Sequence, residues 1–198
     1  MKRNEKKMKS LEPVLRYLQT LAPFETHDLA PFVGRYQTEI FKENDIIFSE
    51  GAFYNRVAFI LEGLVKKYYL TSGGREFFKE FTWEGQITTP YASLLQGIPA
   101  TYTMQALEGT RLFTMDYSVV KTLMETDQKW LRVGKALADF HFLNRENRER
   151  ELLTHSAQDR YANFKKQFPH LLTRLKKQDI ASYLGITPVS LSRLESVK

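Results

Sequence analysis

The sequence predicts an α+β protein with a β-barrel or sandwich first, one long helix after it, and a helix-turn-helix at the C-terminal end. Short apolar runs separated by turn residues, a long stretch with helical periodicity, and a compact Ala/Gly/Pro pattern near the end support this view. The chain has 198 residues, of which 42% are hydrophobic, enough for two small domains. We expect three regions: a β-barrel domain over 1–126, a linking helix over 127–154 and a helix-turn-helix domain over 155–198.

The strands of the barrel are predicted from runs of apolar or alternating residues between Tyr36 and about Met115. The runs are Ile46 to Phe48, Val57 to Leu61, Val65 to Leu70, Glu76 to Phe81, and Thr110 to Met115. Between them lie residues that tolerate tight or left-handed backbone, among them Gly51, Gly63 and Ser72-Gly73-Gly74. Many short strands at this spacing favour a sandwich or barrel.

The long helix is predicted from Asp127 to Leu153, a stretch that no proline interrupts. Its apolar stripe could pack on the barrel or pair with the same helix of a second copy. We favour a homodimer whose contact residues are Trp130, Val133, Leu137, Phe140 and Asn144. A shorter amphipathic helix follows and is expected to end before Pro169.

The helix-turn-helix is predicted over KKQDIASYLGITPVSLSRLES, from Lys176 to Ser196. Ala181 is small where two helices would approach, and Gly185 suits the left-handed end of the first helix. Thr187 followed by Pro188 has the chemistry of an N-cap and a first helical position. The apolar residues of the inner face would be Ile180, Leu184, Ile186, Leu191 and Leu194.

The outward residues of this segment are the candidate DNA-binding residues. In the major groove Arg193 could donate two hydrogen bonds to guanine, and Ser190 could reach a base edge or a phosphate. We expect Gln178 and Thr187 to contact backbone phosphates. The full set is Gln178, Thr187, Pro188, Val189, Ser190, Ser192 and Arg193. The same spacing also fits a helix corner in an unrelated helical domain, so the motif leaves that alternative open.

Composition narrows the functional classes. No cysteine is present, which excludes disulfides, iron–sulfur ligation and thiol catalysis. The net charge is +6, and residues 141–198 carry 11 Lys/Arg against six Asp/Glu, a bias that suits phosphate backbones. No apolar run reaches the roughly 20 residues of a membrane helix and no signal peptide is visible, which predicts a cytoplasmic protein with no membrane partner.

Motifs of known chemistry are missing from the sequence. The four histidines, His27, His141, His155 and His170, lack metal-ligand spacing, so we expect no metal site. The sequence also contains no phosphate-binding GxxxxGK[ST] loop, no dinucleotide GxGxxG turn and no GxSxG nucleophile elbow. We therefore expect no enzymatic activity, and no cofactor beyond an unidentified small-molecule effector.

The chain resembles the Crp/Fnr family of transcription regulators from about Phe32 to Lys198. The resemblance rests on F-K-E-N-D-I-I-F-S-E-G from Phe41, V-A-F-I-L-E-G-L-V-K-K-Y from Val57, and D-I-A-S-Y-L-G-I-T from Asp179. It implies a double-stranded β-helix, that is a jelly roll of the cyclic-nucleotide-binding type, followed by a dimerisation helix. It further implies an effector-modulated homodimer that binds double-stranded DNA and contacts RNA polymerase.

The nucleotide pocket departs from the family pattern. Members that bind cyclic nucleotides use a Gly-Glu pair and a downstream Arg-Ser/Thr pair, whereas Gln86 and Ala100 stand at the matching places here. An alanine cannot neutralise a buried cyclic phosphate, so we predict that cyclic AMP does not bind in the usual way. A neutral effector would suit the predicted pocket better; its residues are Trp83, Gly85, Gln86, Ile87, Tyr91, Ser93, Pro99, Ala100, Thr101 and Tyr102.

The reading helix departs as well. Pro188 and Val189 replace charged base readers, which predicts a different target and an apolar contact from Val189 to a thymine methyl group. The sequence stops at Lys198, where the family continues into a hairpin wing, so we expect fewer phosphate contacts. Two other functions stay open: a sensor or interaction module that never touches DNA, and a regulator whose pocket is filled by its own side chains.

Overall fold

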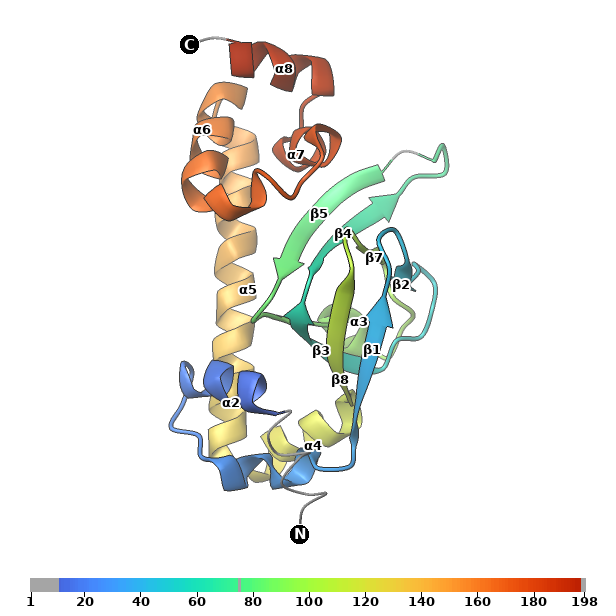
Figure 1. The fold of residues 1–198 in the computed structure, drawn as a ribbon, viewed down its shortest axis with the longest axis vertical. Coiled ribbons are helices and arrows are strands. Elements are labelled where there is room, and N and C mark those ends of the chain that lie inside the picture. Colours follow the sequence, from blue (N-terminus) through green and yellow to red (C-terminus); the bar gives the residue numbers. More distant parts are fainter. Residues whose placement is uncertain (1–10, 75, 197–198) are drawn as a thin grey trace. The chain divides into compact units, whose positions relative to one another are not determined.

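The computed structural model describes residues 11–74 and 76–196 and is drawn in Figure 1. The chain forms two compact units. The first runs up to Lys67 and continues from Phe81 to Ala138, and the second comprises Tyr68–Glu80 and the chain from Asp139 onward.

Two four-stranded sheets confirm the predicted jelly roll. One sheet has the order β1-β8-β3-β6, from β1 (Tyr36–Phe41), β8 (Thr110–Asp116), β3 (Arg56–Glu62) and β6 (Ile87–Thr88). The other has the order β2-β7-β4-β5, from β2 (Ile46–Phe48), β7 (Thr103–Ala106), β4 (Leu64–Leu70) and β5 (Glu76–Trp83). The pairs β1–β8, β3–β8, β3–β6 and β2–β7 are antiparallel.

Side chains from both sheets fill the space between them. Along β3, Ala58 and Ile60 belong to this core, whereas Phe59 between them belongs to a different one on the other face of its sheet. That alternation follows from the two-residue period of a strand. The buried members of the inter-sheet core are Phe48, Ala58, Ile60, Val65, Ala100, Tyr102, Met104 and Leu112.

Helices cover the outer face of the β1-β8-β3-β6 sheet. They are α2 (Glu12–Gln19), the 3₁₀ helix η1 (Thr26–Phe32), α4 (Tyr117–Thr126) and the first half of α5 (Gln128–Thr154). The short helix α3 (Tyr91–Gln96) precedes β7. Helix α2 was not among the predicted elements, although proline in its first turn and the spacing of Leu11, Val14 and Leu18 are signals for it.

Helix α5 matches the predicted long helix, but the role assigned to two of its residues needs correction. Trp130 and Val133 are each only 4% exposed, and they pack in the core beneath α2 and η1. The Trp130 ring lies 4.8 Å from that of Phe24 and 5.0 Å from that of Phe32. These side chains are buried within one protomer and cannot form a dimer surface, whereas Phe140 is 51% exposed.

The second unit contains the C-terminal helices α6 (Ala157–Gln167), α7 (Lys177–Leu184) and α8 (Pro188–Ser196), with the 3₁₀ turn η2 (Pro169–Leu171). Ser156 starts α6 by accepting a hydrogen bond from the Asp159 amide at 3.2 Å. The buried apolar residues of these helices are Phe164, Leu171, Leu175, Ile180, Ala181, Leu184 and Leu191. Within the described residues, no helix is both long enough and apolar enough to cross a membrane.

Candidate nucleic-acid interface and sensory pocket

The turn between α7 and α8 has the geometry that the sequence predicts. Gly185 takes a left-handed conformation, with φ of 68°, and its amide donates to the Ser182 carbonyl at 3.1 Å. The next amide, of Ile186, donates to the Ala181 carbonyl at 3.0 Å, and Ala181 is fully buried. These bonds end α7 and direct the chain into α8.

Helix α8 begins at a side-chain cap. The Ser190 amide donates to the Thr187 Oγ1 at 3.1 Å, and the Thr187 and Ser190 hydroxyls are hydrogen-bonded to one another at 2.9 Å. Pro188 is the first residue of the helix, where its missing N–H costs nothing. Both hydroxyls that we assigned to DNA contacts therefore also fix the start of the helix.

The predicted inner and outer faces of α8 are present. Leu191 is fully buried and Leu194 is partly buried, whereas Val189 is 62% exposed. Of the remaining predicted DNA-binding residues, Ser190 is partly buried and the rest are exposed: Gln178, Thr187, Pro188, Ser192 and Arg193. No hydrogen bond or ion pair engages the Arg193 guanidinium within residues 11–74 and 76–196. The outward face thus presents a cation, an aliphatic group and short polar side chains.

Polar contacts join the three helices α6, α7 and α8. Lys177 of α7 forms an ion pair with Glu195 of α8, and Glu195 also accepts a hydrogen bond from the Tyr161 hydroxyl at 3.2 Å. The hydrogen bond and charge of Lys177 lower the pKa of Glu195. Arg160 donates to the Leu184 carbonyl at 3.0 Å and to the His155 carbonyl at 2.6 Å, which satisfies the end of α7.

Tyr183 of α7 connects the helix-turn-helix with Phe78 on β5 and with the C-terminal half of α5. The residues in contact all belong to the second unit. Its ring lies 5.6 Å from that of Phe78 on β5 in an edge-to-face arrangement. The Arg148 guanidinium lies 4.0 Å from the centre of the Tyr183 ring and donates to the Phe78 carbonyl at 3.4 Å. Burial raises the pKa of Tyr183, so the phenol stays neutral.

Aromatic side chains pack in the space between the two sheets. The Phe48 ring lies 4.6 Å from that of Tyr54 and 5.5 Å from that of Tyr102. The Tyr102 hydroxyl donates to the Thr89 carbonyl at 3.0 Å, which holds this ring in the core. The Tyr54 hydroxyl is buried without a hydrogen-bond partner among the described residues, and burial raises its pKa.

The ten predicted pocket residues do not converge on one cavity. Ala100 and Tyr102 lie in the inter-sheet core, while Ile87 lines a cavity beneath α2 and α5. Gln86 accepts from the Trp83 amide at 3.2 Å and so closes its own turn. The Ser93 hydroxyl is buried without a partner among the described residues. Gly85, Tyr91 and Thr101 are exposed, and Trp83 and Pro99 are partly buried.

Two residues of the inter-sheet core were not predicted from the sequence: Phe48 on β2 and Tyr54 in the loop after β2. Phe48 ends a predicted strand, and Tyr54 follows a glycine turn in which no periodicity shows the side-chain direction. The aromatic residues on both sides of Gly51 were the available signal.

Comparisons with known proteins agree with this architecture. Residues 38–127 match the family model of the cyclic nucleotide-binding domain. A search of curated proteins finds no match to the chain. Among solved structures, FixK2 from Bradyrhizobium japonicum superposes with a TM-score of 0.73 at 21% identity, over 81% of this chain and 83% of FixK2.

Two further solved structures share the fold. A putative transcriptional regulator of the Crp/Fnr family from Eubacterium rectale gives a TM-score of 0.70 at 18% identity, covering 86% of this chain and 82% of its own. The c-di-GMP-responsive global regulator CLP from Xanthomonas campestris gives 0.68 at 13% identity, covering 86% of this chain and 89% of CLP. At these identities the likeness establishes the fold.

Proposed function

We propose that this protein is a sequence-specific DNA-binding regulator that cyclic AMP does not control in the usual mode. The chain matches the cyclic nucleotide-binding domain and has the fold of the Crp/Fnr transcription regulators. The exposed face of α8 is the observation that carries the proposal. Its Arg193 guanidinium is exposed and has no partner within the described residues, as expected of a group that hydrogen-bonds to guanine in the major groove.

The geometry around α8 supports a rigid reading element. The cap at Thr187, the left-handed turn at Gly185 and the Lys177–Glu195 ion pair fix α8 against α7. A helix held in this way keeps its backbone in one orientation, which lowers the entropy that binding must overcome. This rigidity suits insertion of α8 into the major groove of duplex DNA.

Selection of DNA from a random duplex library by the purified chain tests the proposal. We expect enrichment of one motif, with an affinity that falls steeply between about 50 and 200 mM salt because phosphate contacts release counterions. Arg193→Ala should enrich this motif poorly, whereas Arg132→Ala, which removes an exposed arginine of the first unit and changes the net charge equally, should enrich it like the parent. No enriched motif, together with no binding at low salt, would favour the protein-interaction alternative.

The inter-sheet core supports the second half of the proposal. Ala100 contributes only a methyl group, and its backbone is bonded to Gly51 and Ala52 at 2.7 and 2.8 Å. Phe48, Tyr54 and Tyr102 pack against one another in the same core. Binding would have to displace these rings and bury a phosphate beside a methyl group, which is costly.

Titration calorimetry with cyclic AMP tests this half directly. We expect no saturable heat, because neither the charge partner nor the space is present. The Ala100→Arg variant is the matched comparison, and it should remain unable to bind while the three rings fill the core. A low-micromolar isotherm with the unmodified chain would overturn the claim without affecting the proposal of DNA binding.

A further inference from the structure

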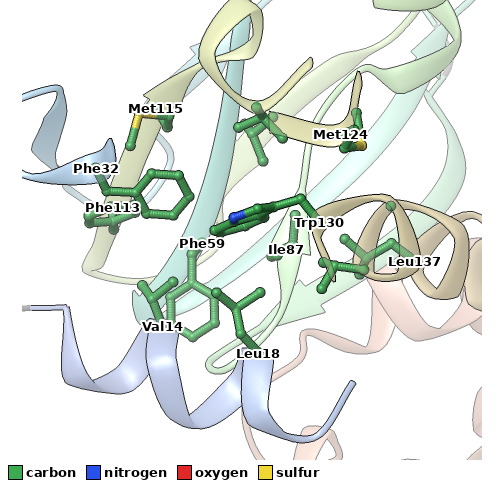
Figure 2. Close-up of a pocket in the computed structure, with 14 residues that line it drawn as sticks. Val14, Leu18, Phe32, Phe59, Ile87, Phe113, Met115, Met124, Trp130 and Leu137 are labelled. Atoms are coloured by element: carbon green, nitrogen blue, oxygen red, sulfur yellow. The ribbon is translucent and has the colours of Figure 1, made fainter. Parts of the chain in front are cut away.

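The cavity lined by Ile87 lies in the first unit, outside the inter-sheet core. Its volume is about 70 Å³, and it lies between α2, the outer face of the β1-β8-β3-β6 sheet, α4 and α5. Figure 2 shows Val14 and Leu18 of α2 pointing toward the Trp130 indole, with Phe59 and Phe113 on the sheet side and Met124 on α4. We propose that this cavity is the effector site, and that it takes a small, uncharged, apolar molecule.

The chemistry of the walls defines the class of ligand. Carbon and sulfur atoms make up almost the whole lining, so a charged or strongly hydrogen-bonding ligand would lose its hydration without compensation. The same walls offer water too few polar partners to hold it, and apolar cavities of this kind stay dry. An apolar molecule gains dispersion contacts there and displaces no bound water.

The volume limits the size of that molecule. An engineered cavity of about 150 Å³ binds benzene or xenon. A cavity of about 70 Å³ has about half that volume. It has room for a ligand of a few heavy atoms, such as a diatomic gas, or for a single xenon atom.

One part of the lining, the Met124 side chain packed on Gly134, can change its conformation. Gly134 lies inside α5, where a glycine costs helix stability, and a Cβ on it would overlap with the Sδ atom of Met124. The missing side chain therefore admits the Met124 thioether, which is flexible and polarisable. A ligand can enlarge the cavity by moving this thioether along the groove over Gly134.

The position of the cavity explains how its occupant would act. Trp130, Gly134 and Leu137 lie on successive turns of α5, and α5 contributes residues to both compact units. A ligand that favours one position of α5 shifts the population of states by its difference in affinity. This regulatory half rests on the proposed DNA-binding function, whereas the binding half does not.

Xenon is the probe that tests the binding half. In a Trp83→Phe background Trp130 is the only tryptophan, and we expect xenon to quench its fluorescence in a saturable manner. Crystals of the unmodified chain held under xenon pressure should show one xenon atom among Val14, Phe59 and Trp130. The absence of xenon at that position would overturn the proposal, whatever the behaviour of the variants.

A filled-cavity variant separates binding from general effects on the fold. Val14→Leu combined with Val120→Leu adds two methylene groups to the lining and should abolish saturable quenching. Ala92→Leu adds apolar volume at an exposed position and should quench like the parent. Equal quenching in all three proteins would contradict the assignment of the site.

The regulatory half has its own readout. The filled-cavity variant imitates the occupied state, so its affinity for a selected DNA duplex should differ at least threefold from that of Ala92→Leu. Unchanged affinity would refute regulation from this cavity even if xenon binds there. Failure of every protein to bind DNA would instead refute the proposed function, while the xenon result would still decide whether the cavity binds ligands.

Discussion

Thr187 shows how one side chain supports the proposed reading helix. Its Oγ1 accepts the Ser190 amide hydrogen bond, which satisfies one of the amides that a helix start leaves without a partner. Sequence alone could predict this role, because capping depends on neighbours three residues away. Gly185 was predictable for the same reason, since a left-handed turn is a local requirement.

Replacing the cap should weaken α8 measurably. We expect Thr187→Ala to reduce the stability of the helix-turn-helix by about 1 kcal/mol, within the range seen for lost N-caps. Amide hydrogen exchange in α8 is the measurement, and faster exchange is the expected result. Thr187→Ser keeps the hydroxyl and should exchange at the parent rate; if both variants exchanged alike, the cap would not be what holds the helix start.

Elements differ in how far the sequence could reveal them. The strands β2 to β5 and the helix α5 were predicted close to their observed ends, because period and turn residues are encoded locally. The apolar stripe of α5 indicated correctly that this face of the helix is in contact with other residues. It did not show with which ones, since Trp130 packs on α2 and η1. The cavity beneath α2 was not predictable, because its walls come from elements that are distant in the sequence: α2, β3, β8, α4 and α5.

The β4–β5 hairpin is an element whose packing against α7 makes a specific prediction. Phe78→Ala removes the ring that contacts Tyr183, and it leaves the Arg148 guanidinium over the Tyr183 ring with fewer neighbours. Aromatic pairs and cation–π contacts stabilise buried sites. Hydrogen exchange in β5 and α7 should therefore speed up together in this variant.

A matched change on the same hairpin completes that test. Phe77 is 47% exposed, whereas Phe78 is buried. Phe77→Ala should leave exchange in α7 unchanged. If the two variants had equal effects on α7, the hairpin would not be held by the Tyr183 contact.

At the scale of the whole molecule, the homodimer predicted from the sequence needs an exposed contact surface, and α5 offers one. Beyond the buried part of the helix, Phe140, Phe142 and Leu143 are between 51% and 62% exposed. A cluster of large exposed apolar side chains marks an interaction surface. Of the predicted dimer residues, Phe140 and Asn144 are exposed, Leu137 is partly buried against the core of the first unit, and Trp130 and Val133 are buried.

A charge placed on that surface should produce monomers. We expect Phe140→Glu to lower the sedimentation-equilibrium mass of the chain from dimer to monomer at micromolar concentration, because pairing would bury an unpaired carboxylate. Ile40→Glu is the control, because Ile40 on β1 is 77% exposed and apolar but lies outside α5. A Phe140→Glu protein that remained dimeric would move the interface elsewhere.

The central claim is that the outward face of α8 reads DNA bases, and Arg193 is its most direct test. The measurement is the affinity of the unmodified chain and of Arg193→Ala for the selected duplex and for duplexes with each guanine replaced. At one guanine the unmodified chain should discriminate by about 10- to 100-fold, corresponding to roughly 1–3 kcal/mol, and Arg193→Ala should lose that discrimination. Arg132→Ala should retain it, and an Arg193→Ala protein that still discriminated at every guanine would contradict the account.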